Sequence, residues 1–138
     1  MDEDNQYCPG IIDIGEAICE LLAENIKELT WSVEVKGPAL GNKPAGTVTA
    51  DHIVFSGGDK GEDLGTITFI LFFIVPDQRT LALEDITMKA REVLIDHADL
   101  DGMVQDSFVK EINYGTAPGM RGANPGAATM TYEVQAWF

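Results

Sequence analysis

The sequence has few of the features that mark membrane or disulfide-rich proteins. Only two cysteines occur, Cys8 and Cys19, and their spacing is not that of a CxxC metal or redox motif. No run of about 18 or more apolar residues is present, and the longest, residues 67–75, is too short to cross a membrane. These absences predict free thiols, synthesis in the cytoplasm and no contact with a membrane.

Basic residues are also scarce. Nine Lys and Arg stand against 23 Asp and Glu, which gives a net charge of −14. A protein that binds nucleic acid by neutralising phosphates needs clustered Lys and Arg, so this class is disfavoured. The acidity keeps a protein soluble, and it also suits a surface past which DNA moves without sticking. The first 30 residues contain eight of the acids and one lysine, so the charge is concentrated there.

Length and composition predict one domain over residues 1–138. The 45% hydrophobic and 23% charged content is ordinary for a globular chain of this size, and no linker or internal repeat divides it. Residues 1–7 are polar and are expected to be frayed.

Two helices are expected, at residues 11–29 and 81–98. In the first, apolar side chains recur at helical spacing and acids lie on the opposite side. In the second, Thr80 is the expected N-cap and Gly102 the stop signal. The apolar side of the first helix is assigned to Ile11, Ile14, Ile18, Leu21, Leu22, Asn25, Ile26 and Leu29, and that of the second to Leu83, Ile86, Ala90, Val93, Leu94 and His97.

Five strands are expected, at residues 31–36, 47–56, 66–75, 107–114 and 128–138, with loops at 37–46, 57–65 and 115–127. This order predicts a two-layer α+β domain, with a mixed or antiparallel sheet of about five strands and both helices on one face. The continuous apolar run 66–75 is typical of a central strand covered on both faces. In so small a domain, we expect a neighbouring subunit to cover part of one face of the sheet. This is either the face that bears Phe69, Leu71 and Phe73 or the face that bears Ile70, Phe72 and Ile74.

Motifs for chemistry are missing. Residues 96–102 resemble part of a calcium loop, but Phe108 occupies the place of the bidentate glutamate. Neither His52 nor His97 has another ligand at metal spacing, and no nucleophile elbow or phosphate loop occurs. The acids Asp13, Glu16, Glu20 and Glu24 on the first helix form either a solvated face or a face toward a channel or partner. We therefore predict no enzyme activity, no catalytic, cofactor-binding or metal-binding residues, and no cofactor.

Read in order, the segments resemble the tail-terminator (tail-completion) family of long-tailed phages and prophages. The resemblance rests on the amphipathic helix GIIDIGEAICELLAENI, the strand end FFIVP, the helix LEDITMKAREVLIDHADLDGMVQD, the strand VKEINYG, a Gly-rich loop and the closing strand TMTYEVQAW. It covers nearly the whole chain but lies in layout rather than in one sharp motif. The ten-residue loop at 37–46 departs from the family in its length.

The resemblance implies a structural protein that forms a ring, usually a hexamer, which ends the tail tube and helps to join it to the head. Its implied partners are further copies of itself, the tail tube protein and head–tail connector proteins, and its implied location is the virion tail, assembled in the host cytoplasm. DNA would pass through the ring without specific binding, past the acidic face. By analogy, two loops would contact the tube or neighbouring subunits, through Asp59, Lys60, Glu62, Asp63, Met120, Arg121 and Asn124. Two alternatives stay open: another neck or head–tail connector protein, and a small α+β ligand-binding domain or enzyme without a coded motif.

Overall fold

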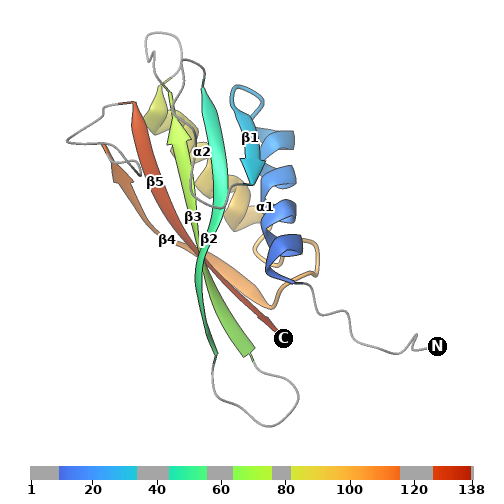
Figure 1. Cartoon of the computed structure of the whole chain (residues 1–138). Coiled ribbons are helices and arrows are strands. Elements are labelled where there is room, and N and C mark those ends of the chain that lie inside the picture. Colours follow the sequence, from blue (N-terminus) through green and yellow to red (C-terminus); the bar gives the residue numbers. More distant parts are fainter. Residues whose placement is uncertain (1–9, 34–43, 56–63, 76–81, 116–125, 138) are drawn as a thin grey trace.

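The computed structural model describes residues 10–33, 44–55, 64–75, 82–115 and 126–137. Within these residues, two helices and five strands follow one another in the predicted order α-β-β-β-α-β-β (Figure 1). Their bounds are α1 Ile11–Asn25, β1 Thr30–Val33, β2 Ala45–Phe55, β3 Leu64–Ile74, α2 Leu83–Asp96, β4 Asp106–Tyr114 and β5 Ala127–Trp137.

The strands form one mixed sheet in the order β1-β2-β3-β5-β4. The short strand β1 runs parallel to β2, and every other neighbouring pair is antiparallel. The most apolar strand, β3, lies in the centre and pairs along its whole length with β5. The predicted two-layer α+β class is therefore confirmed, and so is the central place of β3.

Both helices pack on the same side of the sheet (Figure 1). Helix α1 lies against β1 and β2, whereas α2 lies against β4 and β5. Every second residue of β3 faces the helices and is almost fully buried, as are alternate residues of β5. This helix-facing core layer contains Ile67, Phe69, Leu71 and Phe73 of β3 and Met130, Tyr132 and Val134 of β5.

Helix α1 ends four residues before its predicted end at Leu29. The Asn25 side chain donates to the Leu21 carbonyl (2.8 Å), and Ile26 leaves the helical conformation at φ −126°. The indole of Trp31 then donates to the Ile26 carbonyl at 2.9 Å. Leu29 is buried after this turn, but Asn25 is exposed, so its assignment to the apolar side was wrong.

The start of α2 also differs from the prediction. The N-cap is Ala82 rather than Thr80, and no side-chain hydrogen bond caps the helix. Thr80 lies outside the described residues. Within α2, Thr87 is fully buried although the pattern did not place it in the core, because its hydroxyl bonds the Glu84 carbonyl (3.0 Å) and the Tyr114 hydroxyl (2.6 Å).

All three predicted loops lose residues to strands, and Ala127 of the loop 115–127 belongs to β5. Ala45 and Gly46 belong to β2 instead of the loop 37–46, and Leu64 and Gly65 belong to β3 instead of the loop 57–65. Gly46 fits because the Trp31 ring crosses the backbone there, and an added Cβ would lie 2.4 Å from that ring.

The turn between α2 and β4 has an unusual backbone. Leu100 (φ 50°), Asp101 (φ 58°) and Gly102 (φ 85°) are consecutive and all left-handed. Non-glycine residues adopt this conformation rarely, and here burial of Leu100 holds the turn in place. The feature that resembled a calcium loop is thus a tight turn that ends the helix.

Candidate functional site

The four acids predicted to form a face do lie together on the outside of α1. Asp13, Glu16, Glu20 and Glu24 are all exposed, on the side opposite the buried Ile14, Ile18 and Leu22. Asp13 also accepts a hydrogen bond from the Gly10 amide (3.3 Å), and this bond stabilises the start of the helix. A contact of this face with a channel or a partner stays a prediction.

Glu16, Glu20 and Glu24 make no ion pair with any part of the chain that the structure describes. Lys27 is the single basic residue of the segment 10–33, so its charge offsets little of the acid around it. Carboxylates gathered in this way produce a negative potential that attracts cationic groups and repels phosphate.

A groove of about 410 Å³ runs beside this face, between α1 and the turn that follows α2. Its apolar surface comes from Ala17, Leu21, Leu100 and Met103. Glu20, Glu24 and Asp101 supply carboxylates along it. Sequence reasoning missed this groove because its two walls lie about 80 positions apart in the chain. Its mixture of acid and apolar surface suits a long cationic side chain, whose stem is apolar and whose head is charged.

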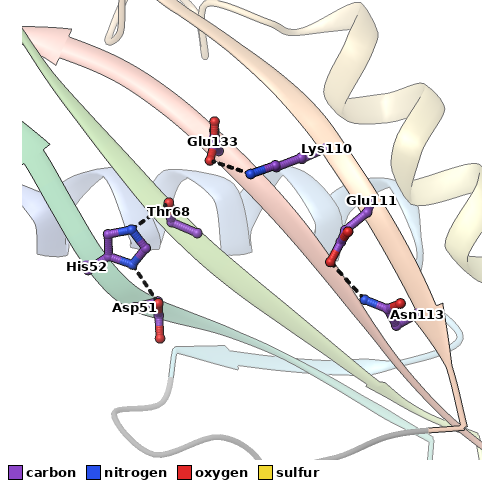
Figure 2. A network of polar contacts seen from close by, with 7 residues as sticks. All are labelled: Asp51, His52, Thr68, Lys110, Glu111, Asn113 and Glu133. Carbon is purple, nitrogen blue, oxygen red and sulfur yellow. Dashed lines mark hydrogen bonds and ion pairs between the residues drawn. The ribbon is translucent and has the colours of Figure 1, made fainter.

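The other face of the sheet carries no helix and bears a group of polar side chains (Figure 2). On β2, His52 Nδ1 lies 2.6 Å from Asp51 Oδ2, and His52 Nε2 lies 3.4 Å from Thr68 Oγ1 on β3. When Nδ1 carries the proton and donates to Asp51, Nε2 accepts from the Thr68 hydroxyl. The sequence did not reveal this group, because it depends on a bulge at Asp51 that sets two adjacent side chains side by side.

An acid, an imidazole and a hydroxyl in this order resemble a nucleophile with its base. The site lacks other parts that such chemistry needs. The imidazole and the carboxylate are more than half exposed, at 54% and 55%, and they do not line the groove beside α1. The 3.4 Å separation is at the long limit for a hydrogen bond. The geometry therefore supports a surface hydrogen-bond network.

A second bulge, at Lys110 of β4, adds two further polar contacts to this face (Figure 2). Lys110 Nζ lies 3.7 Å from Glu133 Oε2, and the Asn113 amide donates to Glu111 at 3.0 Å. Charges and a bulge on an edge strand discourage uncontrolled pairing with other strands.

Burial of the helix-free face is uneven. Along β3, Phe72 and Ile74 are buried whereas Ile70 is partly exposed, and on the flanking strands Val54 and Phe108 are about half exposed. The face bearing Ile70, Phe72 and Ile74 is thus the one with surface left for a neighbour, and the face bearing Phe69, Leu71 and Phe73 is filled by the helices. A neighbouring subunit on it remains a prediction.

Two buried hydroxyls on this helix-free face, those of Thr47 and Thr49, have no hydrogen-bond partner among the residues that the structure describes. Both threonines are at least nine-tenths buried, and Thr47 lies opposite Phe72 in the register. A buried hydroxyl without a partner has a desolvation cost of about 1–3 kcal/mol.

Cys19 and His97 are the remaining residues that the sequence singled out for possible chemistry. Cys19 is half-buried, and burial, followed by the charges of Glu20 and Glu16, raises the pKa of its thiol, which makes it a poor nucleophile. His97 caps the end of α2. No cluster of three metal-binding side chains occurs in the described ranges, and none of the described helices is long and apolar enough to cross a membrane.

The predicted contact residues of the two loops lie outside the described residues: Asp59, Lys60, Glu62, Asp63, Met120, Arg121 and Asn124. The structure does show the strands on either side of them. β2 ends and β3 begins at one end of the sheet, whereas β4 ends and β5 begins at the other (Figure 1). The contacts of the two loops stay predictions.

The fold and its surfaces thus define a two-layer α+β domain with an acidic helix and a partly open sheet face. A scan against models of known protein families finds no match, and a search of curated proteins finds no relative.

Proposed function

We propose that this chain is a structural subunit of a phage or prophage tail, which forms a ring that ends the tail tube and joins it to the head. The partners in this proposal are further copies of the chain, the tail tube protein and head–tail connector proteins. The family resemblance implies about six copies in the ring. The site of action is the virion tail.

The observation that carries the proposal is the acidic outer face of α1. Glu16, Glu20 and Glu24 project into solvent without ion pairs in the described part of the chain. Such a surface favours passage of DNA, because phosphates are repelled and find no cationic site at which to stop. The layout of segments and the half-exposed apolar residues of the helix-free sheet face support the same proposal.

The proposal includes no enzyme activity and no cofactor. The observation that favours an enzyme instead is the Asp51–His52–Thr68 network. Its exposure to solvent removes the low-dielectric environment in which acid–base groups act most strongly. A connector elsewhere in the neck is the nearer alternative, since it needs the same acidic surface and self-association.

Negative-stain electron microscopy of the purified chain tests the proposal. The expected images are uniform rings with a central opening wide enough for duplex DNA. Compact single particles without an opening, at every concentration, would count against a ring and favour a ligand-binding domain. Substitution of His52 by alanine is expected to leave the rings unchanged. If the chain were an enzyme that used the Asp51–His52–Thr68 network, His52 would be essential for its activity.

A further inference from the structure

The acidic groove has a complementary surface on the same chain. On α2, Met88, Arg91 and Ile95 follow at helical spacing and lie on one side of the helix. Met88 and Ile95 are unusually exposed for large apolar residues, at 45% and 49%. Arg91 makes no ion pair within the described residues. We call Met88, Arg91 and Ile95 the α2 stripe.

The α2 stripe and the groove are separate patches. Thr87, one turn before Arg91, bonds Tyr114 of β4, so this side of α2 is the side toward the β4 edge. The groove lies on α1, which packs over β1 and β2 at the opposite part of the sheet. Two different patches that fit one another generate a head-to-tail contact, in which each added copy leaves one patch free for the next.

We propose that the α2 stripe of one copy docks into the acidic groove of a second copy. The stem of Arg91 packs on Leu21 and Met103, and its guanidinium lies among the carboxylates of Glu20, Glu24 and Asp101. Met88 and Ile95 cover the apolar rim on either side. Glu84, one turn before Met88, limits the favourable contact to the part of α2 from Met88 onward.

This inference rests on the proposed ring and specifies the contact that closes it. In the assembled ring, Glu20 and Glu24 then lie in an interface between subunits and no longer face DNA, so Asp13 and Glu16 of each copy supply the negative lumen of the proposed function. The second copy is the favoured occupant because the chain itself supplies Arg91, which has no ion-pair partner in the described ranges and is flanked by exposed apolar residues that match the groove.

Charge reversal at both sides of the contact tests the inference. Sedimentation velocity would compare the unmodified chain with Arg91→Glu and Glu20→Arg. Each reversal is expected to weaken self-association by about tenfold or more, because it places like charges together in a partly desolvated groove. Lys89→Glu and Glu16→Arg are the matched controls: each makes the same change of charge on the same helix, outside the contact, and is expected to alter association less than twofold. Circular dichroism verifies that every variant is folded.

Mixing the two variants gives the sharper result. In an alternating ring, the new glutamate of one variant meets the new arginine of the other, and the next contact is the native pair. An equimolar mixture of Arg91→Glu and Glu20→Arg is therefore expected to recover the native oligomer that neither forms alone. Equal weakening by Arg91→Glu and Lys89→Glu, or failure of the mixture to recover, overturns the inference.

The experiments distinguish an error in the proposed docking contact from an error in the proposed ring. A native ring that Arg91→Glu leaves intact overturns the docking of the α2 stripe, while the proposed function stands. An unmodified chain that stays monomeric at every concentration overturns both. Head-to-tail docking leaves one α2 stripe and one groove free in a dimer, so a third copy can bind. A dimer as the largest species would therefore contradict this docking.

Discussion

The Tyr132 hydroxyl donates to Ser107 Oγ at 2.7 Å, inside the core and between neighbouring strands. Ser107 in turn donates to the Ala98 carbonyl at 2.6 Å. This chain of two bonds connects β5, β4 and the turn after α2, which forms one wall of the acidic groove. The shape of the groove therefore depends on a buried polar connection as well as on apolar packing.

Removal of the two hydroxyls is expected to have unequal effects. Tyr132→Phe leaves Ser107 bonded to Ala98 and should lower the free energy of unfolding by about 1 kcal/mol. Ser107→Ala leaves the buried Tyr132 hydroxyl without a partner and should cost more, about 1–3 kcal/mol. Urea unfolding measures both, and a larger loss for Tyr132→Phe would contradict the assigned direction of the bonds.

Alkaline pH is expected to destabilise the protein through the same tyrosine. Burial is the main cause that raises the pKa of Tyr132 from 10.0 to about 12. The neutral form is thus favoured in the folded state, so this stabilisation is complete below pH 10 and is lost as the pH rises through 12. The unfolding free energy, measured by urea titration at pH 9 to 12, should fall more steeply for the native chain than for Tyr132→Phe. Parallel profiles would contradict the raised pKa.

Two glycines are expected to respond in opposite ways to alanine. A Cβ at Gly46 would lie 2.4 Å from the Trp31 ring, which also packs edge-on against Phe73 at a centroid distance of 5.7 Å. Gly46→Ala should therefore destabilise the fold by about 1–3 kcal/mol. At Gly15, inside α1, the nearest atom to a Cβ is 3.5 Å away, and alanine should stabilise the helix by about 0.5–1 kcal/mol. Thermal unfolding of both variants gives the comparison, and equal shifts would show that the Trp31 contact is not tight.

Cys19 is expected to react slowly with alkylating reagents. Its pKa is raised, first by burial and then by Glu20 and Glu16, so little thiolate is present at pH 8. In a Cys8→Ser background, iodoacetamide should modify Cys19 more slowly than a free thiol. Glu16→Gln should increase the rate, and Glu84→Gln on α2 should not. An unchanged rate with Glu16→Gln would show that the charge of Glu16 does not contribute to the raised pKa of this thiol.

The acidic face is expected to prevent retention of DNA. Asp13→Lys with Glu16→Lys places four more positive units on the first turns of α1, outside the groove. Glu84→Lys with Asp85→Lys makes the same change in the first turn of α2. Fluorescence anisotropy with duplex DNA at low salt should show no binding by the native chain and stronger binding by the α1 variant than by the α2 variant. Equal binding by both variants would remove the special role of α1.

The sequence was sufficient for the class of fold because the patterns in its central elements are strong. The alternation in 128–138 predicted the buried Met130, Tyr132 and Val134, and the apolar run 66–75 predicted the central strand. The end of α1 was wrong by four residues, since it depends on a hydrogen bond from Trp31 that no local pattern shows. The parallel pairing of β1 with β2 and the bulges at Asp51 and Lys110 are also tertiary features.

The candidate surfaces divide in the same way. Helical spacing alone placed Asp13, Glu16, Glu20 and Glu24 on one exposed face. The groove needed the turn at Leu100–Met103 to pack beside α1, and the His52 network needed two strands in register. Both are made by residues that are far apart in sequence, so no local sequence pattern could predict them.

The native mass in solution tests the central claim most directly. Light scattering after size exclusion, at several concentrations, is expected to give one closed species near six chains whose mass does not change on dilution over a moderate range. A monomer at all concentrations would contradict self-assembly and direct attention to ligand binding. A mass that rises continuously with concentration would indicate open polymers in place of a closed ring.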